Sequence, residues 1–276
     1  MILVTGASGT VGSAVCAELD GAERRVRAAV RSPERFDGPA EEVVEFDFTD
    51  PTTYREAFSG VESLFLVRPP QLSRVRRDIV PALAAAVGAG VEHVVFLSVI
   101  GADRNPMVPH ARIESWLDDV GVETTYLRAS FFMQNLTTVH REEVRDGELF
   151  VPAGDGATSF VDARDVAAVG AKALTEGVTG TYDLTGPEAL DYYEVAAILS
   201  ATLDHDVTYR NPSLPRFLWQ RYRIDRNLSK TAVMAGIYTT ARLGLAGRVT
   251  DDLEALLERA PTDFETFARE HRTIWQ

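Results

Sequence analysis

Residues 1–12 carry the sequence MILVTGASGTVG, which predicts a short buried strand, a glycine turn and the start of a helix. The unbroken apolar run Ile2–Val4 is typical of a central parallel strand covered on both faces. Gly6 permits the tight turn, Gly9 lets a phosphate approach the backbone, and Gly12 lets the helix pack close to the strand. The helix directs its free N–H groups and the positive end of its dipole toward the turn, where a pyrophosphate binds. This segment therefore predicts a dinucleotide site.

A glycine turn that binds no ligand is the alternative, but the order of strand, turn and helix favours the dinucleotide motif. The expected cofactor contacts in this segment are Gly6, Ser8, Gly9, Thr10, Val11 and Gly12. Ligands of open α/β sheets lie beyond the carboxyl ends of the strands, so residues that follow other strands belong to the same predicted site.

The chain has 276 residues, of which 45% are hydrophobic, which suits one large domain or a domain with an additional lobe. No apolar run approaches the length of a membrane span, and residue 1 leads directly into a strand rather than into a signal sequence, so we expect a cytoplasmic protein. Cys16 is the only cysteine, which excludes an intramolecular disulfide and a cysteine metal cluster. We expect no metal, and we expect Cys16 to pack as a small apolar residue.

The formal net charge is −13, which argues against nonspecific binding to nucleic acid or to acidic membranes. The expected partner is a small-molecule substrate, and the protein is expected to be a monomer or a homodimer.

Strand and helix patterns alternate through the first half of the chain. The predicted strands after the first are 25–31, 42–46, 63–67, 92–98 and 123–128. The predicted helices between them are 51–59 with Asp50 as its N-cap, 74–89 with Pro81 as a kink or late start, and 111–120. Strands separated by helices indicate an α/β fold with a doubly wound parallel sheet of the Rossmann type.

The pattern changes after residue 128. We expect a helix that starts at an aromatic cluster in 131–136, a short strand at 158–161, a helix at 163–175 and a returning strand at 180–184. The remaining predicted elements are helices at 192–203, 215–223, 230–243, 251–259 and 263–271, with a short strand at 207–209. We therefore expect a dinucleotide-binding domain over 1–186 and a smaller, mostly helical lobe over 187–276 that caps the substrate.

The end of the second strand indicates which dinucleotide binds. An acid at this place holds the ribose hydroxyl of NAD, whereas an arginine accommodates the additional phosphate of NADP. Arg31 ends the strand, no acid takes its place, and Arg35 lies one helical turn further on. Because a guanidinium can bind a phosphate through two parallel hydrogen bonds, we expect the cofactor to be NADP(H). The alternative is that Arg31 is only a solvated strand end.

Other strand ends supply further expected contacts. After the third strand, Asp47 is expected to bond the adenine amino group and Phe48 to stack on the ring. Val67, Arg68 and Pro69 follow the fourth strand at the same edge of the sheet. The fifth strand ends with Ser98, which is expected near the nicotinamide as a cofactor contact and a candidate catalytic residue, and Ile100 beyond it is expected at the substrate. Ser98 is alternatively an ordinary strand-end hydroxyl.

These features resemble the atypical, NmrA-like group of the short-chain dehydrogenase/reductase superfamily. The matching motifs are VTGASGTVG at 4–12, VR at 30–31, DF at 47–48, LS at 97–98, HxxxE at 110–114, LRASFFMQNL at 127–136, FVDARDVA at 160–167 and GPEAL at 186–190. The group includes triphenylmethane reductases, NADPH-dependent quinone reductases and regulators of nitrogen-metabolite repression. The resemblance implies NADP(H) and covers essentially the whole chain, becoming weak after about residue 207.

The chain departs from the superfamily at its catalytic pair. Typical members carry Tyr-x-x-x-Lys on the helix after the fifth strand, and the aligned positions here are His110 and Glu114. A spacing of four places both side chains on one helix face. We expect His110 to donate a proton, and Glu114 to orient His110 or to bond the ribose hydroxyls. The alternative is an ordinary histidine and a solvated glutamate.

The substrate side follows the sixth strand. We expect Phe131 to border the nicotinamide, and Phe131, Phe132 and Asn135 to contact the substrate together with Ile100 and His110. An aromatic wall favours a flat or hydrophobic acceptor. Three residues of the later helices are expected to close the pocket, although aromatic residues at helical spacing are more often part of a core. They are Phe217, Met234 and Tyr238.

Three functions remain open at this point. The first is an NADPH-dependent reductase of a quinone, dye, imine or similar acceptor, with the proton supplied by His110 or by solvent. The second is a non-catalytic NADP(H) sensor, which the missing tyrosine and lysine favour. The third and weakest is an epimerase- or dehydratase-like enzyme, because a fold does not fix a function.

Overall fold

The structure is a computed structural model that describes residues 1–276, apart from the side chain of Ser229. The chain divides into two compact units, each of which is described by itself. The first comprises residues 1–129, 163–184 and 255–258, and the second comprises 130–162, 185–254 and 259–276. Among the described residues, no helix combines the length and the apolar character that crossing a lipid bilayer requires.

The first unit is built on a seven-stranded parallel sheet with the order β3-β2-β1-β4-β5-β6-β8. Its strands are β1 (Ile2–Thr5), β2 (Val26–Val30), β3 (Glu42–Glu45), β4 (Ser63–Leu66), β5 (His93–Val99), β6 (Glu123–Ala129) and β8 (Gly180–Leu184). The chain runs outward from β1 to β3 and then returns to β4 on the other side of β1. Open α/β sheets bind their ligands at such a reversal, beyond the carboxyl ends of the two strands, which here are β1 and β4.

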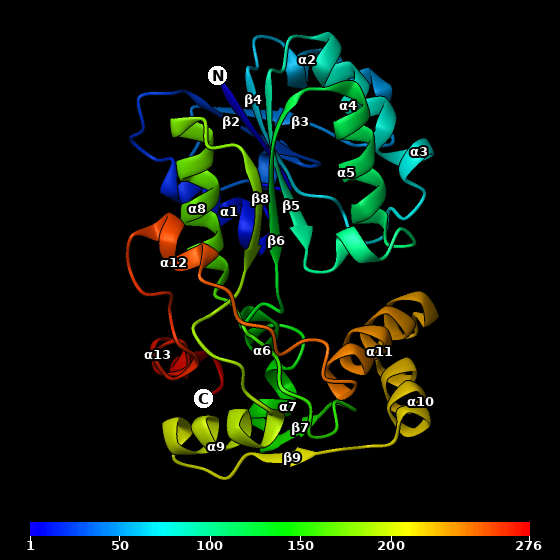
Figure 1. Ribbon diagram of the computed structural model, residues 1–276, viewed down its shortest axis with the longest axis vertical. Helices are drawn as coiled ribbons and strands as arrows, with labels where there is room; N and C mark the ends of the chain where they lie inside the picture. The colour runs from blue at the N-terminus through cyan, green and yellow to red at the C-terminus, as the bar shows by residue number, and fades with distance from the viewer. The chain divides into compact units, whose positions relative to one another are not determined.

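Helices cover both faces of this sheet (Figure 1). Helices α1 (Thr10–Glu18) and α8 (Ala163–Glu176) lie on one face, and α4 (Val80–Gly88) and α5 (Pro109–Val120) lie on the other. The shorter elements of the unit are η1 (Pro33–Arg35), η2 (Pro51–Thr53), α2 (Tyr54–Phe58), α3 (Val75–Asp78) and η3 (Ala102–Arg104). Because both faces are covered, β1 and β4 are buried along their whole length.

The second unit has a core rich in aromatic side chains. Its elements are α6 (Gln134–Thr137), α7 (Arg141–Arg145), β7 (Glu148–Phe150), α9 (Tyr192–Leu203), β9 (Thr208–Arg210), α10 (Leu214–Asp225), α11 (Leu228–Arg242), α13 (Phe264–Glu270) and η4 (Arg272–Ile274). β7 and β9 pair in parallel, and a capping box of Asp191 and Glu194 starts α9. Helix α12 (Asp252–Leu257) contributes its first residues to this unit and its last to the other.

Most of the predicted elements are confirmed. The strands at 25–31, 42–46, 63–67, 92–98 and 123–128 each match within one residue at either end. The Asp50 side chain caps its helix by accepting from the Thr52 N–H. The segment 74–89 forms α3 and then α4, with Pro81 in the first turn of α4, which is the late start. Cys16 is buried as expected.

Two predictions for the second half need correction. The predicted strand at 158–161 is only two isolated bridges, Phe132 to Val161 and Thr158 to Leu190. The predicted domains 1–186 and 187–276 differ from the two units, because residues 130–162 belong to the second unit. They do so because Thr158 exchanges backbone hydrogen bonds with Leu190, and because β7 pairs with β9.

Candidate functional site

The glycine turn after β1 has no room for side chains. Gly6 has a φ of +63°, a backbone conformation that glycine adopts without strain. A Cβ at Gly12 would lie 2.2 Å from the carbonyl oxygen of Gly6, so α1 passes directly against the turn. The Gly9 N–H donates to that carbonyl at 2.8 Å, which closes the turn. Only glycine at position 12 allows this arrangement.

The amino end of α1 is open to an anion. Its N-cap, Gly9, offers no side-chain bond, and the first turn contains no acid. Ser8, Gly9 and Thr10 are exposed, whereas Val11 and Gly12 are buried. The first N–H groups of a helix have no partner within it, and a phosphate that accepts from them also meets the positive end of the helix dipole. The residues therefore fit a dinucleotide pyrophosphate.

Two arginines lie beyond the carboxyl end of β2. Arg31 is exposed, and its side chain makes no hydrogen bond or ion pair with any residue that the structure describes. Arg35 ends η1, is 84% exposed, and approaches only Glu34, at 3.9 Å. Neither guanidinium is committed to a close internal partner, so both remain available to a phosphate.

The loop after β4 lies beside the glycine turn. Thr5 Oγ1 accepts from the Val67 N–H at 2.8 Å, and the Val67 side chain faces Gly6. Arg68 donates from Nη1 to the carbonyls of Pro69, Pro70 and Leu72 at 2.8, 3.2 and 3.0 Å, which stiffens the loop. Its Nε is buried and has no partner in the described chain. An unpaired buried donor is costly, and an acceptor oxygen of a ligand would satisfy it.

Phe48 does not fit its expected role. Its ring is 6% exposed and packs edge-on against Phe46, with ring centroids 4.8 Å apart, inside the core of the first unit. It is therefore not available to stack on adenine. Residues two apart in an extended segment point to the same side, so the spacing of Phe46 and Phe48 was the signal for a shared core position. Asp47 remains half-buried at the strand end, with Oδ1 accepting from the N–H and hydroxyl of Thr49.

Glu114 and Ser98 also differ from expectation. Glu114 is 5% exposed and forms a two-pronged ion pair with Arg128, at 3.1 Å from Nε and 2.7 Å from Nη2. Ser98 is buried and donates to Glu114 Oε1 at 2.5 Å. Both carboxylate oxygens are thus engaged inside the unit, and no hydrogen bond joins the Glu114 carboxylate to the His110 ring among the described residues. Glu114 fixes α5 to β5 and β6 rather than orienting His110 or bonding a ribose.

Sequence reasoning missed Arg128, the partner of Glu114. The signal was present, because an arginine near the end of a mostly buried strand requires a carboxylate nearby. Glu114, on the helix that precedes this strand, supplies it.

His110 lies in the first turn of α5, half-buried, with its ring stacked on Phe96 at a centroid distance of 5.9 Å. Burial, and secondarily the positive charge of Arg68, lower the pKa of His110 from 6.5 to about 3. The imidazole is therefore neutral near pH 7. It can donate or accept a hydrogen bond, but it is not an imidazolium acid. Ile100 follows β5 and is half-buried.

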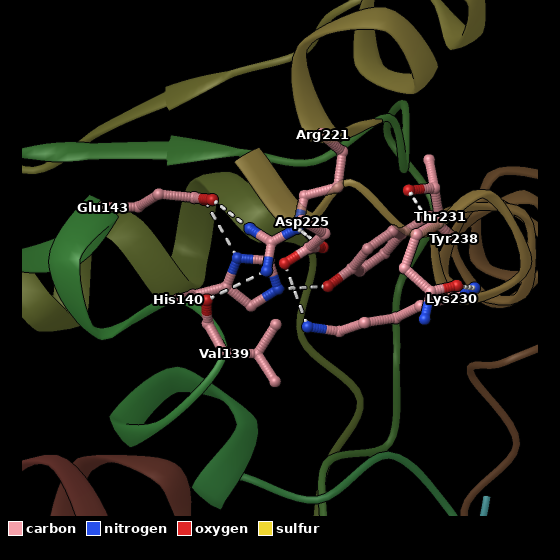
Figure 2. A network of polar contacts seen from close by, with 9 residues as sticks. Val139, His140, Glu143, Arg221, Asp225, Lys230, Thr231 and Tyr238 are labelled. Carbon is pink, nitrogen blue, oxygen red and sulfur yellow. Dashed lines mark hydrogen bonds and ion pairs between the residues drawn. The ribbon is translucent and has the colours of Figure 1, made fainter. Parts of the chain in front are cut away.

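In the second unit, two residues expected at the substrate are core residues. Phe217 is 1% exposed and Tyr238 is 2% exposed, which leaves neither ring free to contact a ligand. Figure 2 shows the Tyr238 hydroxyl directed at His140, to which it is hydrogen-bonded. Phe131 and Met234 pack partly buried against the same core, and Phe132 and Asn135 are half-buried. These four remain accessible candidates for an acceptor surface.

Comparisons with known proteins agree with this geometry. The sequence profile of the NmrA-like family matches residues 1–268. The NAD(P)H azoreductase of Xenophilus azovorans is 32% identical over 286 residues, 98% of each chain, and quinone oxidoreductase 2 of Escherichia coli is 29% identical over 223 residues, 77% of this chain and 78% of the other.

Solved structures share the fold along the whole chain. The NADPH-dependent quinone oxidoreductase of Escherichia coli in complex with NADPH superposes with a TM-score of 0.87 at 25% identity, covering 98% of this chain and 99% of the other. The triphenylmethane reductase of Citrobacter sp. complexed with NADP(H) gives 0.87 at 24% identity over 99% and 100%. The matched profile, the whole-length relative and the shared fold lead to one conclusion: this chain belongs to the NmrA-like family.

Proposed function

We propose that this protein is an NADPH-dependent reductase that transfers hydride to a small hydrophobic or conjugated acceptor such as a quinone, a dye or an imine. The observation that carries the proposal is the open glycine turn, in which Gly12 has no space for a Cβ and the helix start carries no capping side chain. Its whole-length relative named as an NAD(P)H azoreductase and its shorter match named as a quinone oxidoreductase support the same class of reaction.

The residues of the first unit would hold the cofactor along its length. The α1 N–H groups would bind the pyrophosphate, Arg31 and Arg35 the ribose phosphate, and the unpaired Nε of Arg68 an oxygen of the ligand. The preference for NADP(H) over NAD(H) rests on Arg31, because no acid takes its place. When bound, the cofactor supplies a hydride, and the protein supplies binding and orientation.

The proton that balances the hydride would come from solvent. The His110 imidazole is neutral near pH 7, and the Glu114 carboxylate is hydrogen-bonded to Arg128 and Ser98. Quinones, azo groups and cationic dyes accept hydride without an acid of the tyrosine type, because their negative charge is delocalised or their positive charge is neutralised. The residues present thus favour such acceptors over simple ketones.

The test is consumption of NADPH against a panel of quinones, azo and triphenylmethane dyes and imines, with acceptor loss followed in the same sample. The proposal expects stoichiometric loss of both with at least one class. Absence of acceptor-dependent oxidation across the panel contradicts it.

We further propose that the protein is cytoplasmic and that it is a monomer or a homodimer. Cell fractionation would test the location, and size-exclusion chromatography would test the oligomeric state.

A second function, an NADP(H) sensor without catalysis, is favoured by one observation. The usual tyrosine and lysine are replaced by a neutral His110 and by a Glu114 that is fully engaged. A sensor must bind NADP⁺ and NADPH with different affinities, because a ligand shifts an equilibrium only by its differential affinity. Equal dissociation constants, measured by calorimetry, would exclude it.

A further inference from the structure

A buried polar network joins three helices of the second unit (Figure 2). His140 immediately precedes α7, Glu143 lies in α7, Arg221 lies in α10 and Tyr238 lies in α11. The side chains of His140, Arg221 and Tyr238 are 1%, 7% and 2% exposed. Ionic and polar groups at this depth require complete pairing, so their arrangement is specific rather than incidental.

Glu143 determines that Nδ1 of His140 carries a proton. Its Oε2 lies 2.9 Å from His140 Nδ1, its Oε1 accepts from Arg221 Nη1 at 3.0 Å, and Oε2 also accepts from the Phe150 N–H at 3.2 Å. Burial acts to raise the pKa of Glu143, but its hydrogen bond with His140, the Phe150 N–H and the Arg221 charge lower it below the ordinary value. A carboxylate only accepts, so His140 carries its proton on Nδ1.

The tautomer then fixes the tyrosine hydroxyl. The Tyr238 hydroxyl donates to Nε2, because the imidazole nitrogen opposite a protonated Nδ1 offers a lone pair and the described chain holds no other acceptor for the tyrosine proton. Burial above all raises the pKa of Tyr238 well above its ordinary value, so the phenol keeps its proton. The chain Glu143–His140–Tyr238 therefore has one direction of hydrogen bonding.

Arg221 anchors this chain from α10. Its Nε donates to Asp225 Oδ2 at 2.8 Å, and Asp225 Oδ1 in turn accepts from Lys230 Nζ at 3.0 Å. Arg221 Nη2 lies 3.4 Å from the carbonyl of Val139. Helices α10 and α11 are thus both tied to the segment that contains His140 and Glu143.

The Tyr238 ring lies behind an accessible aromatic residue. Its centroid is 6.0 Å from that of Phe131, 5.7 Å from that of Phe217 and 6.0 Å from that of Tyr192. Phe131 is only half-buried and also meets the buried Phe160 edge-on at 5.6 Å. Phe131 is therefore held by Tyr238 and by Phe160, and only the exposed part of its ring is available to a ligand.

We propose that Tyr238 is a positioning residue for the acceptor: the Glu143–His140–Tyr238 chain sets the angle of its ring, and the ring holds Phe131 in the orientation that contacts the acceptor. The inference rests on the proposed function, because it assigns the accessible side of Phe131 to the acceptor. Because Phe131 is already ordered before the acceptor binds, no entropic cost of immobilising its side chain is added on binding.

The principal test is Tyr238→Phe, which keeps the ring and removes the hydroxyl. Tyr222→Phe is the matched control, because Tyr222 lies on α10 and is 43% exposed. With menadione and a triphenylmethane dye as acceptors, Tyr238→Phe should raise KM, and the Kd of the dye measured by difference absorbance, by roughly three- to tenfold. The kcat and the Kd of NADPH should stay within twofold, because the lost binding affects ground state and transition state equally. A lower melting temperature with unchanged KM and dye Kd would overturn the proposal.

A second measurement separates this proposal from the proposed function. Aromatic carbon NMR of phenylalanine-labelled protein identifies the Phe131 resonance as the one lost in Phe131→Leu. That resonance should shift in Tyr238→Phe and not in Tyr222→Phe, whether or not any acceptor is reduced. A protein that reduces nothing refutes the proposed function alone, whereas an unmoved Phe131 resonance refutes the positioning role.

The order of the chain is testable at its other end. In Glu143→Gln the amide can donate as well as accept, so nitrogen NMR should show the His140 proton move partly from Nδ1 to Nε2. The variant should raise KM as Tyr238→Phe does, and the double variant should be no worse than either single one, because both break one chain. Additive effects on KM, or an unchanged tautomer, would contradict the single chain.

Discussion

Gly12→Ala is the change whose effect the structure determines most directly. The added Cβ would lie 2.2 Å from the Gly6 carbonyl oxygen, and ordinary contact begins at 3.4 Å, so the turn and α1 must separate by about 1.2 Å (3.4 − 2.2). Overpacking of this kind destabilises by about 1–3 kcal/mol. The same displacement removes the α1 N–H groups from the 2.7–3.2 Å range in which they bond a phosphate. Loss of one such charge-assisted bond, about 1.5–3 kcal/mol, weakens NADPH binding by roughly 10- to 160-fold.

The assay compares Gly12→Ala with Gly88→Ala by thermal unfolding and by fluorescence titration with NADPH. Gly88 also lies in a helix of the first unit, and a Cβ there would meet nothing within 4 Å. The control should gain up to about 1 kcal/mol in free energy of unfolding, because alanine is the better helix former, and should bind NADPH normally. A Gly12→Ala protein with wild-type melting temperature and an NADPH Kd within twofold of wild type would refute the account of the turn.

Three further predictions concern Arg31, Glu114 and His110. Arg31→Ala should reduce the ratio of NADPH to NADH affinity by at least about tenfold, as expected when a charge-assisted phosphate bond is lost; an unchanged ratio removes Arg31 from the site. Glu114→Gln should lower the free energy of unfolding by about 3 kcal/mol, because Arg128 keeps its charge beside a neutral amide, and denaturant unfolding within 0.5 kcal/mol of wild type, the range of an ordinary surface substitution, would contradict the buried pair. The pKa of His110 is about 3 in the folded protein and 6.5 in the unfolded chain. Between pH 6.5 and about 3 the unfolded chain therefore binds more protons than the folded protein, and the wild type loses stability as the pH falls through that range. His110→Gln should lack this part of the loss in pH-dependent unfolding, and kcat of the wild type should show no inflection from His110 between pH 5 and 8; a kcat inflection near 6.5 that disappears in His110→Gln would show that the imidazole titrates normally.

The sequence was sufficient for the sheet and the glycine turn because those features are local. The apolar run Ile2–Val4 and the three glycines each carry their meaning within a few residues. The parallel sheet follows from the alternation of strand and helix patterns. The predicted strands at 25–31, 42–46, 63–67, 92–98 and 123–128 each match the observed strand within one residue at either end.

The substrate side was less predictable because it depends on distant pairings. Nothing local to Tyr238 indicates that its hydroxyl meets His140, which lies 98 positions earlier. Likewise, the spacing of His110 and Glu114 predicts a shared helix face, but only the tertiary position of Arg128 turns Glu114 into a buried ion pair. Residues 130–162 were assigned to the wrong unit because their partners, Leu190 and β9, lie far along the chain.

Whether the protein is a reductase is tested most directly by a single anaerobic experiment in which the protein, NADPH and one acceptor from each of the quinone, azo and triphenylmethane classes are followed by absorbance. We expect NADPH to disappear together with at least one acceptor, one NADPH per quinone or triphenylmethane dye and one or two per azo bond. Gly12→Ala should slow both losses, and NADH should be the poorer donor. Tight NADPH binding with no acceptor reduced in any class would contradict the reductase and favour the NADP(H) sensor.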